Sequence, residues 1–217
     1  LHSTRRRQRQ MCIRDRVSDK ANIDLAVRGI VFGAVGTAGQ RCTTLRRLIV
    51  HTSVYDVLMT KLKSAYASLP VGDNFKEETL VGPLINQESV DRMQSALEQA
   101  KAKGYTVHGG EVVEGCSVRP AIVEATEQCD LIKTETFAPI LYVLKYSDLD
   151  EAINIHNAVP QGLSSCIFTD NVQEAETFTS AVGSDCGIVN INIGPSGAEI
   201  GGAFGLSLIH ISEPTRH

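Results

Sequence analysis

The 217-residue chain contains no tryptophan, only three methionines and 5% aromatic residues. No apolar run approaches the roughly 20 residues of a membrane-spanning helix, so we expect no membrane partner. The cysteines form no Cys-x-x-Cys pair and show no paired spacing, which argues against a zinc site or a disulfide framework and favours free thiols in a reducing cytoplasm. His51, His108 and His156 are scattered and do not form a metal-ligand set.

Both ends of the chain look foreign to the rest. Met11-Cys-Ile-Arg-Asp15 is the translation of one strand of a sequencing-adapter oligonucleotide, and Leu206–Ser212 is the translation of the complementary strand. Two strands of one oligonucleotide at opposite ends are a specific signal, so we interpret residues 1–16 and 206–217 as artefact and expect them to pack poorly. The alternatives for the arginine-rich N-terminus are an organellar presequence or a nucleic-acid-binding arm.

Residues 17–205 remain, which is about the length of one domain. The two ends carry seven of the 21 basic residues and two of the 25 acidic residues, which leaves 14 against 23 and a net charge of −9. Domains that bind nucleic acid are usually basic. We therefore expect no nucleic-acid partner.

Helical and strand patterns alternate along residues 17–205. Apolar strands are predicted at 45–51, 106–108, 118–123, 140–146, 163–169 and 187–192, and helices at 23–35, 53–69, 87–103, 148–157 and 172–181. Ser53 and Asn86 are the predicted N-caps of the second and third helices. Strands that are apolar on both sides need helices on both faces of their sheet. The pattern predicts an α/β domain with a largely parallel sheet.

One thiol stands at the end of a run rich in small residues. The run Val31–Cys42 contains Gly33, Ala34, Gly36, Ala38 and Gly39 and closes on Gly-Gln-Arg-Cys. Small residues let the backbone approach a ligand closely, and a cationic neighbour favours the nucleophilic thiolate form of cysteine. The alternative for Cys42, taken alone, is an inert packed thiol.

Further segments follow the thiol in an order that matches a known family. They are Glu135-Thr-Phe-Ala-Pro139, Asn157 to Gly162-Leu163, Gly187-Ile-Val-Asn190 and Ala203-Phe-Gly205. Together with Gly39–Cys42, they make residues 17–205 resemble the catalytic domain of NAD(P)-dependent aldehyde dehydrogenases, most closely the antiquitin-like branch (family 7), the α-aminoadipic semialdehyde dehydrogenases. Ala138 departs from the wider family, which usually has glycine there. The resemblance implies a partial catalytic domain with a Rossmann-like, largely parallel sheet and flanking helices.

The resemblance also implies the reaction and its residues. Cys42 would add to an aldehyde carbon to form a thiohemiacetal, loss of hydride to NAD (or NADP) would leave a thioester, and water would release the carboxylic acid. The backbone N–H of Cys42 would help to bind the oxyanion. Glu135 resembles the glutamate that binds the nicotinamide ribose, and Phe137 the residue that packs against the nicotinamide; their alternatives are a solvated loop acid and a core aromatic.

Arg41 indicates the branch within the family. A semialdehyde with a distal amino acid group needs a cation for its carboxylate, and guanidinium pairs well with carboxylate. Ser196, Gly197 and Ala198 resemble the loop that anchors this polar end through backbone N–H groups, and Phe204 resembles an aromatic wall around the aliphatic part of the substrate. The alternatives are a structural ion pair for Arg41 and a plain turn for residues 196–198.

Other parts of the family pattern are not found in the 217 residues. The family's general base is a glutamate in a Glu-Leu-Gly-Gly motif, and counting back from Cys42 by the family's spacing reaches Gln8, inside the foreign N-terminal end. The cofactor-binding half, the oxyanion asparagine, the lysine that meets the cofactor and the oligomerising tail of the family's homotetramer also have no match. We expect the chain alone to be inactive.

The sequence leaves other functions open. Within enzymes, the alternative is an aldehyde dehydrogenase for betaine aldehyde or an aliphatic aldehyde. A non-catalytic module is the second alternative. The third is a cysteine acyltransferase, which would need a histidine partner and has no use for the segment 135–139. The choice between NAD and NADP is not visible in these residues.

Overall fold

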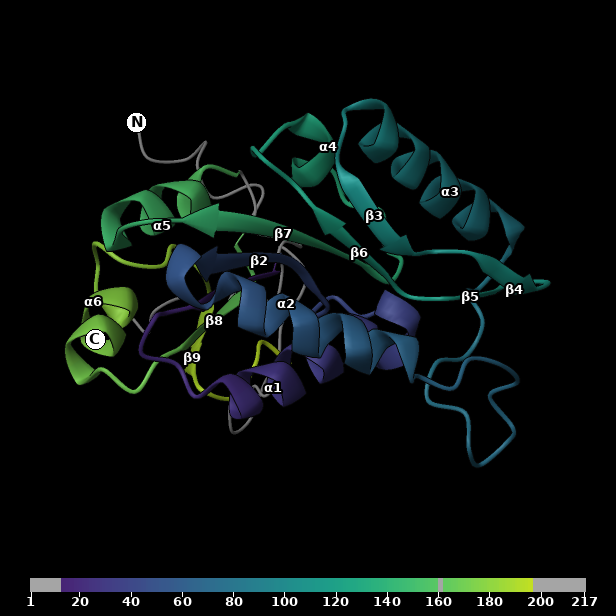
Figure 1. The fold of residues 1–217 in the computed structure, drawn as a ribbon, viewed down its shortest axis with the longest axis horizontal. Coiled ribbons are helices and arrows are strands. Elements are labelled where there is room, and N and C mark those ends of the chain that lie inside the picture. The colour runs from purple at the N-terminus through teal and green to yellow at the C-terminus, as the bar shows by residue number, and fades with distance from the viewer. Residues whose placement is uncertain (1–12, 160–161, 197–217) are drawn as a thin grey trace, which may run out of the picture.

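A seven-stranded sheet forms the centre of the molecule (Figure 1). The computed structural model describes residues 13–159 and 162–196. The strand order is β3-β6-β7-β2-β1-β8-β9, and every neighbouring pair is parallel except β3 and β6. The predicted α/β fold with a largely parallel sheet is confirmed. The strands are β1 Ile13–Val17, β2 Leu45–His51, β3 Thr106–Gly109, β6 Ala121–Glu124, β7 Ile140–Tyr146, β8 Ser164–Phe168 and β9 Ile188–Ile191, with a separate ribbon of β4 Val112–Glu114 and β5 Ser117–Val118.

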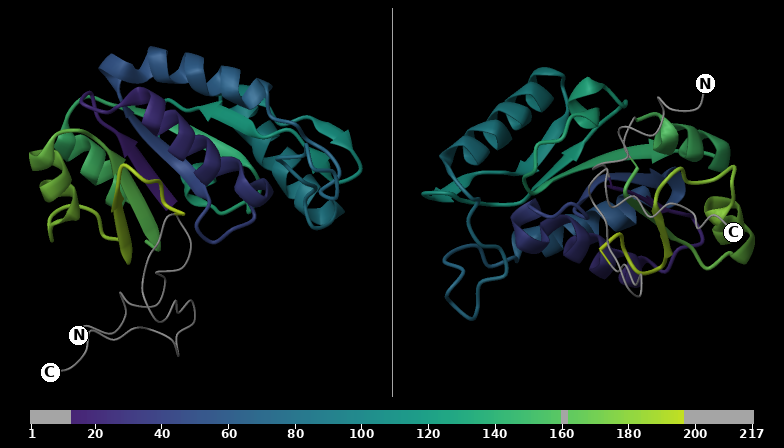
Figure 2. Two further views of the ribbon diagram at one scale, coloured as in Figure 1. Left: turned by 90° about the horizontal axis from the view of Figure 1, so that it is seen from below. Right: turned by 180° about the vertical axis from the view of Figure 1, so that it is seen from behind.

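Helices cover both faces of the sheet, as the two-sided apolar strands require (Figure 2). Helices α1 (Ile23–Val35) and α2 (Thr52–Ala67) lie together on one face. The other face carries α3 (Gln87–Ala102), α4 (Asp130–Lys133), α5 (Leu149–Asn157) and α6 (Val172–Thr179). No helix in the described ranges has the length and apolarity needed to cross a membrane.

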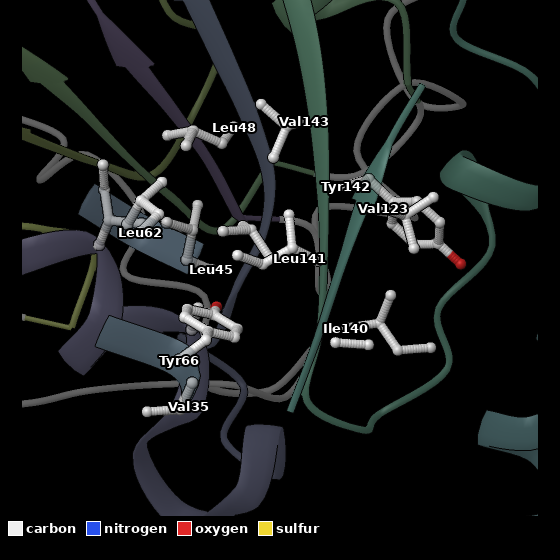
Figure 3. Packing of buried hydrophobic residues seen from close by; sticks show 14 of the residues in the cluster. Val35, Leu45, Leu48, Leu62, Tyr66, Val123, Ile140, Leu141, Tyr142 and Val143 are labelled. Carbon is white, nitrogen blue, oxygen red and sulfur yellow. The ribbon is translucent and has the colours of Figure 1, made fainter. Parts of the chain in front are cut away.

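The core fills the space between β2, β7 and the helices on both sides (Figure 3). Leu45, Leu62 and Leu141 meet on the side of α1 and α2, while Val123 and Tyr142 lie on the other side of β7. Leu45, Leu62, Leu141 and Val123 are fully buried. Burial of each such side chain stabilises the fold by roughly 1.5–3 kcal/mol.

Strand β1 contradicts one prediction. We expected residues 1–16 to pack poorly, but residues 13–16 belong to a strand that pairs in parallel with β2 and with β8 at the centre of the sheet. Asp15 and Arg16 are fully buried. In the described structure the carboxylate of Asp15 has only a poorly aligned contact with the backbone of Cys166. No hydrogen-bond partner there reaches a guanidinium nitrogen of Arg16, which rests against the rings of Tyr146 and Phe178. The strand therefore gains backbone pairing at the cost of buried polar groups.

Helix caps agree with the sequence except at α2. Asn86 caps α3 by accepting a hydrogen bond from the backbone of Ser89, as predicted. The predicted cap Ser53 is wrong: α2 begins one residue earlier, and His51 caps it by accepting from the backbone of Ser53 at 3.2 Å. The predicted strand at 118–123 is divided into β5 and β6, and the short helix η1 (Gly36–Gly39), α4 and β4 were not predicted.

Candidate active site

Two loops meet at one edge of the sheet because the strands that follow them are neighbours. Strands β2 and β7 pair in parallel, with Arg47 opposite Tyr142. The loop before β2 carries Cys42, and the loop before β7 carries residues 135–139. The amino ends of neighbouring parallel strands lie at the same edge. Motifs that are more than ninety residues apart in the sequence are thus brought side by side.

Cys42 lies at the tip of a tight turn. The backbone N–H of Thr44 donates to the carbonyl of Arg41 at 3.1 Å, and the backbone N–H of Arg41 donates to the Thr44 hydroxyl at 3.0 Å. Thr44 is fully buried, whereas Cys42 is half-buried. Among the described residues, the N–H of Cys42 has no hydrogen-bond acceptor. The hydrogen bonds between Arg41 and Thr44 thus hold the two ends of the turn together, and the thiol and backbone N–H of Cys42 lie at its tip.

The segment before this turn has an unusual backbone. The short helix η1 (Gly36–Gly39) contains Thr37 at φ 56° and Ala38 at φ 51°, followed by Gly39 at φ 70°. Left-handed backbone costs about 1–2 kcal/mol at each residue other than glycine. Such strain persists where surrounding contacts over-determine it, often at functional sites.

Gly39 brings the two motifs into direct contact. A Cβ atom at this position would lie 2.5 Å from both the carbonyl carbon of Ala138 and the nitrogen of Pro139. Only glycine permits this approach. The next residue, Gln40, anchors the loop on its other side, because its amide accepts from the backbone of Ile85 at 2.9 Å and donates to the carbonyl of Pro83 at 3.4 Å.

Glu135 and Phe137 share one arginine. Nη2 of Arg46 lies 2.8 Å from Oε1 of Glu135, and the guanidinium carbon lies 5.1 Å from the centre of the Phe137 ring. Arg46 is 5% exposed, whereas Glu135 and Phe137 are half-buried and Phe137 has a left-handed backbone at φ 57°. Burial raises the pKa of Glu135, and the charge of Arg46 opposes this rise.

Arg41 lies beside Cys42 in the sequence, but its side chain points to α1. Its Nη2 donates to the carbonyl of Phe32 at 2.9 Å, and the guanidinium carbon is 4.9 Å from the centre of the Phe32 ring. A side chain at Gly36 would collide with this guanidinium. Phe32 is in the last turn of α1, and its carbonyl also accepts from the backbone N–H of Gly36, so Arg41 is a second donor to a carbonyl at the C-terminus of the helix.

Ser196 reaches the loop that carries Cys42. After β9, the chain returns along α1: a Cβ atom at Gly33 would touch Pro195 at 3.2 Å, and the Ser196 hydroxyl donates to the carbonyl of Thr43 at 2.9 Å. The predicted anchor residue Ser196 is thus bonded to Thr43, the residue that follows Cys42 in the sequence. Its companions Gly197, Ala198 and Phe204 lie outside the described residues.

Sequence reasoning missed Arg46 and Gln40. Arg46 follows Cys42 by four residues and opens an apolar strand, where a charged residue is usually taken as solvent-exposed. Gln40 belongs to the recognised segment, but its link to Ile85 requires the fold. Four other cysteines lie within the described residues, at core or loop positions typical of structural thiols: Cys166 is buried, and Cys116, Cys129 and Cys186 are half-buried.

Comparison with known proteins agrees with this geometry. The profile of the aldehyde dehydrogenase family matches residues 16–206. The chain is 50% identical over 192 residues to aldehyde dehydrogenase family 7 member A1 of Pisum sativum, covering 87% of this chain and 38% of that protein. It is 48% identical over 191 residues to α-aminoadipic semialdehyde dehydrogenase of Bos taurus, covering 86% and 35%.

A solved structure shows the same fold. The NADP-dependent glyceraldehyde-3-phosphate dehydrogenase from Bacillus halodurans, complexed with NADP, superposes with a TM-score of 0.78 at 28% identity, covering 85% of this chain and 38% of that chain. The chain spans little more than a third of the length of these relatives. The family profile, the curated relatives and the fold agree: the chain belongs to the aldehyde dehydrogenase family.

Proposed function

We propose that the chain supplies the nucleophile and part of the cofactor site of an NAD(P)-dependent aldehyde dehydrogenase whose substrate is α-aminoadipic semialdehyde. The observation that carries the proposal is the contact of Gly39 with Ala138 and Pro139, which joins the thiol loop to the segment 135–139. An acyltransferase needs the thiol but has no use for this second segment. The substrate follows from relatives of family 7, one of which is named for that semialdehyde.

Cys42 is the proposed nucleophile. Its Sγ attacks the aldehyde carbon, and the carbonyl oxygen becomes an oxyanion within reach of the free backbone N–H of the same residue. Collapse of this thiohemiacetal expels hydride and leaves a thioester on Sγ, which water then cleaves to the carboxylic acid and free thiol. The water needs a general base, and the 217 residues contain no Glu-Leu-Gly-Gly motif.

The residues beside the thiol fit a nicotinamide nucleotide. Oε1 of Glu135 is buried and has no aligned hydrogen bond. The side chain as a whole is 23% exposed, so its accessible surface belongs to its other atoms. A carboxylate of this kind can accept hydrogen bonds from ribose hydroxyls. Phe137 offers a half-buried ring next to it. Bound NAD or NADP would supply the hydride acceptor.

Arg41 and Ser196 are the proposed contacts of the substrate's amino acid end. Ser196 supports this role by its bond to Thr43, which places the start of the 196–198 loop beside the thiol. Arg41 must exchange its bond to the Phe32 carbonyl for the substrate carboxylate. The exchange is favoured because a carboxylate carries the opposite charge and can accept two parallel bonds from a guanidinium, whereas the Phe32 carbonyl is neutral.

The assembly and location of the enzyme belong to the same proposal. We propose a homotetramer in the cytoplasm, based on the family resemblance and on the free-thiol pattern.

A chimera tests the proposal. Residues 17–205 replace the matching segment of the Pisum sativum relative, which supplies the remaining parts of the enzyme. We expect NADH formation from α-aminoadipic semialdehyde, and we expect Cys42→Ser to abolish it while NAD binding persists. Turnover of Cys42→Ser at a tenth of the parental rate would contradict the assigned nucleophile.

Substrate choice is tested with Arg41→Ala in the same chimera. The semialdehyde should lose about ten- to a hundredfold in kcat/KM, since a hydrogen bond to a charged group is worth roughly 1.5–3 kcal/mol. Hexanal, which has no carboxylate, should lose little. Equal losses for both substrates would leave Arg41 as a cap of α1 and would favour a different aldehyde.

A further inference from the structure

Arg46 contacts both segments of the proposed site, the segment 135–139 and the turn that carries Cys42. Its guanidinium lies 2.8 Å from Oε1 of Glu135, stacks 5.1 Å from the Phe137 ring centre and donates to the carbonyl of Arg41 at 3.4 Å. The first two contacts lie in the segment that precedes β7. The third lies in the turn that carries Cys42. No other described side chain forms polar contacts with both segments.

We propose that Arg46 is a positioning residue that holds the carboxylate of Glu135 and the ring of Phe137 in fixed places relative to Cys42. The inference rests on the proposed function, because those two residues are the proposed contacts of the nicotinamide nucleotide. Arg46 touches neither substrate nor reacting atoms. It acts through Glu135 and Phe137.

The chemistry of guanidinium suits this task better than ammonium. A planar guanidinium can present an edge N–H to a carboxylate while its face stacks on an aromatic ring, whereas an ammonium is a compact point charge. Arg46 is 5% exposed, so its charge is poorly screened by water and acts strongly on its neighbours. Phe137 also needs an external restraint, because its backbone is left-handed.

The backbone of Arg46 is held through its neighbours. Arg46 is the second residue of β2, at the point where the register with β1 shifts: Leu45 pairs with Ile13 and Arg47 with Arg14, and pairing with β7 begins at Arg47. A hydrogen bond from this side chain to the Arg41 carbonyl also closes the turn around Cys42. Movement of Arg46 would therefore displace the thiol and the cofactor residues together.

The neighbour Arg47 provides a matched control. It is fully buried, but its contacts are different: it donates to Gln128 and to the carbonyls of Ile155 and His156. Removing either arginine should lower stability. Only removal of Arg46 should change Glu135 and Phe137.

The test uses the 217-residue chain with labelled glutamate and phenylalanine, observed by NMR. In Arg46→Met, the carboxylate of Glu135 should titrate at higher pH than in the wild type, and the ring signal of Phe137 should broaden or shift. Arg46→Lys should restore the titration of Glu135 but leave the ring signal altered. Arg47→Met should move neither signal, even if its thermal midpoint falls.

A second measurement covers the case in which Arg46→Met does not fold. Glu135→Gln removes the partner instead of the arginine, and it should also shift the Phe137 ring signal because the guanidinium loses its anchor. Unchanged Glu135 titration and Phe137 signals in the folded variants would overturn the proposal. Equal effects of Arg46→Lys and Arg46→Met on Glu135 would also contradict it.

The chimera separates this proposal from the proposed function. Arg46→Met should raise the KM for NAD by about tenfold, and it should also change the rate at which iodoacetamide alkylates Cys42, because the same guanidinium closes the turn that carries this thiol. If the chimera oxidises aldehydes and Arg46→Met leaves the KM for NAD unchanged, the positioning role fails and the function stands. If no aldehyde is oxidised but the NMR signals respond as expected, the function fails and the role of Arg46 in fixing Glu135 and Phe137 stands.

Discussion

Replacing Asp15 by valine should stabilise the chain. Asp15 is at the centre of the sheet and fully buried, and the contact of its carboxylate with the backbone of Cys166 lacks the geometry of a full hydrogen bond. A buried polar group without a partner costs about 1–3 kcal/mol. Valine is branched at Cβ and suits a strand packed on both sides. At about 2 kcal/mol, and with 2–4 °C per kcal/mol for a chain of this size, the thermal midpoint should rise by about 4–8 °C.

The same residue predicts a dependence on pH. Burial raises the pKa of Asp15 well above its ordinary value. In the unfolded chain, the carboxyl loses its proton near pH 4. Between that pH and the higher pKa of the folded state, only the unfolded chain has released the proton, so the free energy of unfolding falls as the pH rises.

Urea unfolding of three variants at pH 5 and pH 8 tests this reasoning. Asp15→Val should be more stable than the wild type at both pH values, with the larger gain at pH 8. Asp15→Asn should lose the pH dependence but keep part of the cost of a buried polar group, and Asp56→Asn, at an exposed position of α2, should behave as the wild type. The reasoning would be refuted if Asp15→Val were less stable than the wild type. It would also be refuted if the wild type were more stable at pH 8 than at pH 5 and this difference disappeared in Asp15→Asn.

Other residues give predictions of different kinds. Gly39→Ala should destabilise the chain by more than about 2 kcal/mol and raise the alkylation rate of Cys42, because the new methyl group meets the backbone of Ala138; an unchanged thermal midpoint would contradict that contact. Thr37→Asn should stabilise by up to about 1 kcal/mol in urea unfolding, since asparagine tolerates the left-handed backbone better. Burial opposes ionisation of Glu124, but bonds from Lys63 and other groups outweigh it and lower its pKa to about 2; stability should therefore fall from about pH 4 towards pH 2, and this fall should be smaller in Glu124→Gln.

The predicted strands agree with the structure where the apolar pattern of the side chains and the pairing of the backbone favour the same structure. The strand 140–146 is apolar on both sides, and the structure buries it between two helical layers. Strand β1 could not be predicted, because Arg14, Asp15 and Arg16 have no strand pattern. Strand β1 lies between β2 and β8 and forms backbone hydrogen bonds with both. Parallel backbone pairing does not depend on which side chains the strand carries.

The candidate site was predictable only in its recognised segments. Cys42 and the Glu135–Pro139 segment could be associated through the family resemblance, and β2–β7 pairing supplies the physical reason. The direction of Arg41 could not be predicted, because it depends on the absence of a side chain at Gly36, one turn earlier. Arg46 could not be predicted either, since its contacts with Glu135 and Phe137 come from a segment about ninety residues later in the chain.

The strained backbone explains why the two segments behave as one unit. Thr37 and Ala38 are left-handed on one side of the Gly39 contact, and Phe137 is left-handed on the other side. Each would relax to a right-handed or extended backbone if it were released, since the left-handed form costs about 1–2 kcal/mol per residue. What prevents relaxation is the interface itself: Gly39 against Ala138, with Arg46 bridging the two loops. A change that loosens either segment releases strain in the other, so the position of the Cys42 thiol and that of the Glu135 carboxylate are energetically coupled through the Gly39–Ala138 contact and the Arg46 bridge.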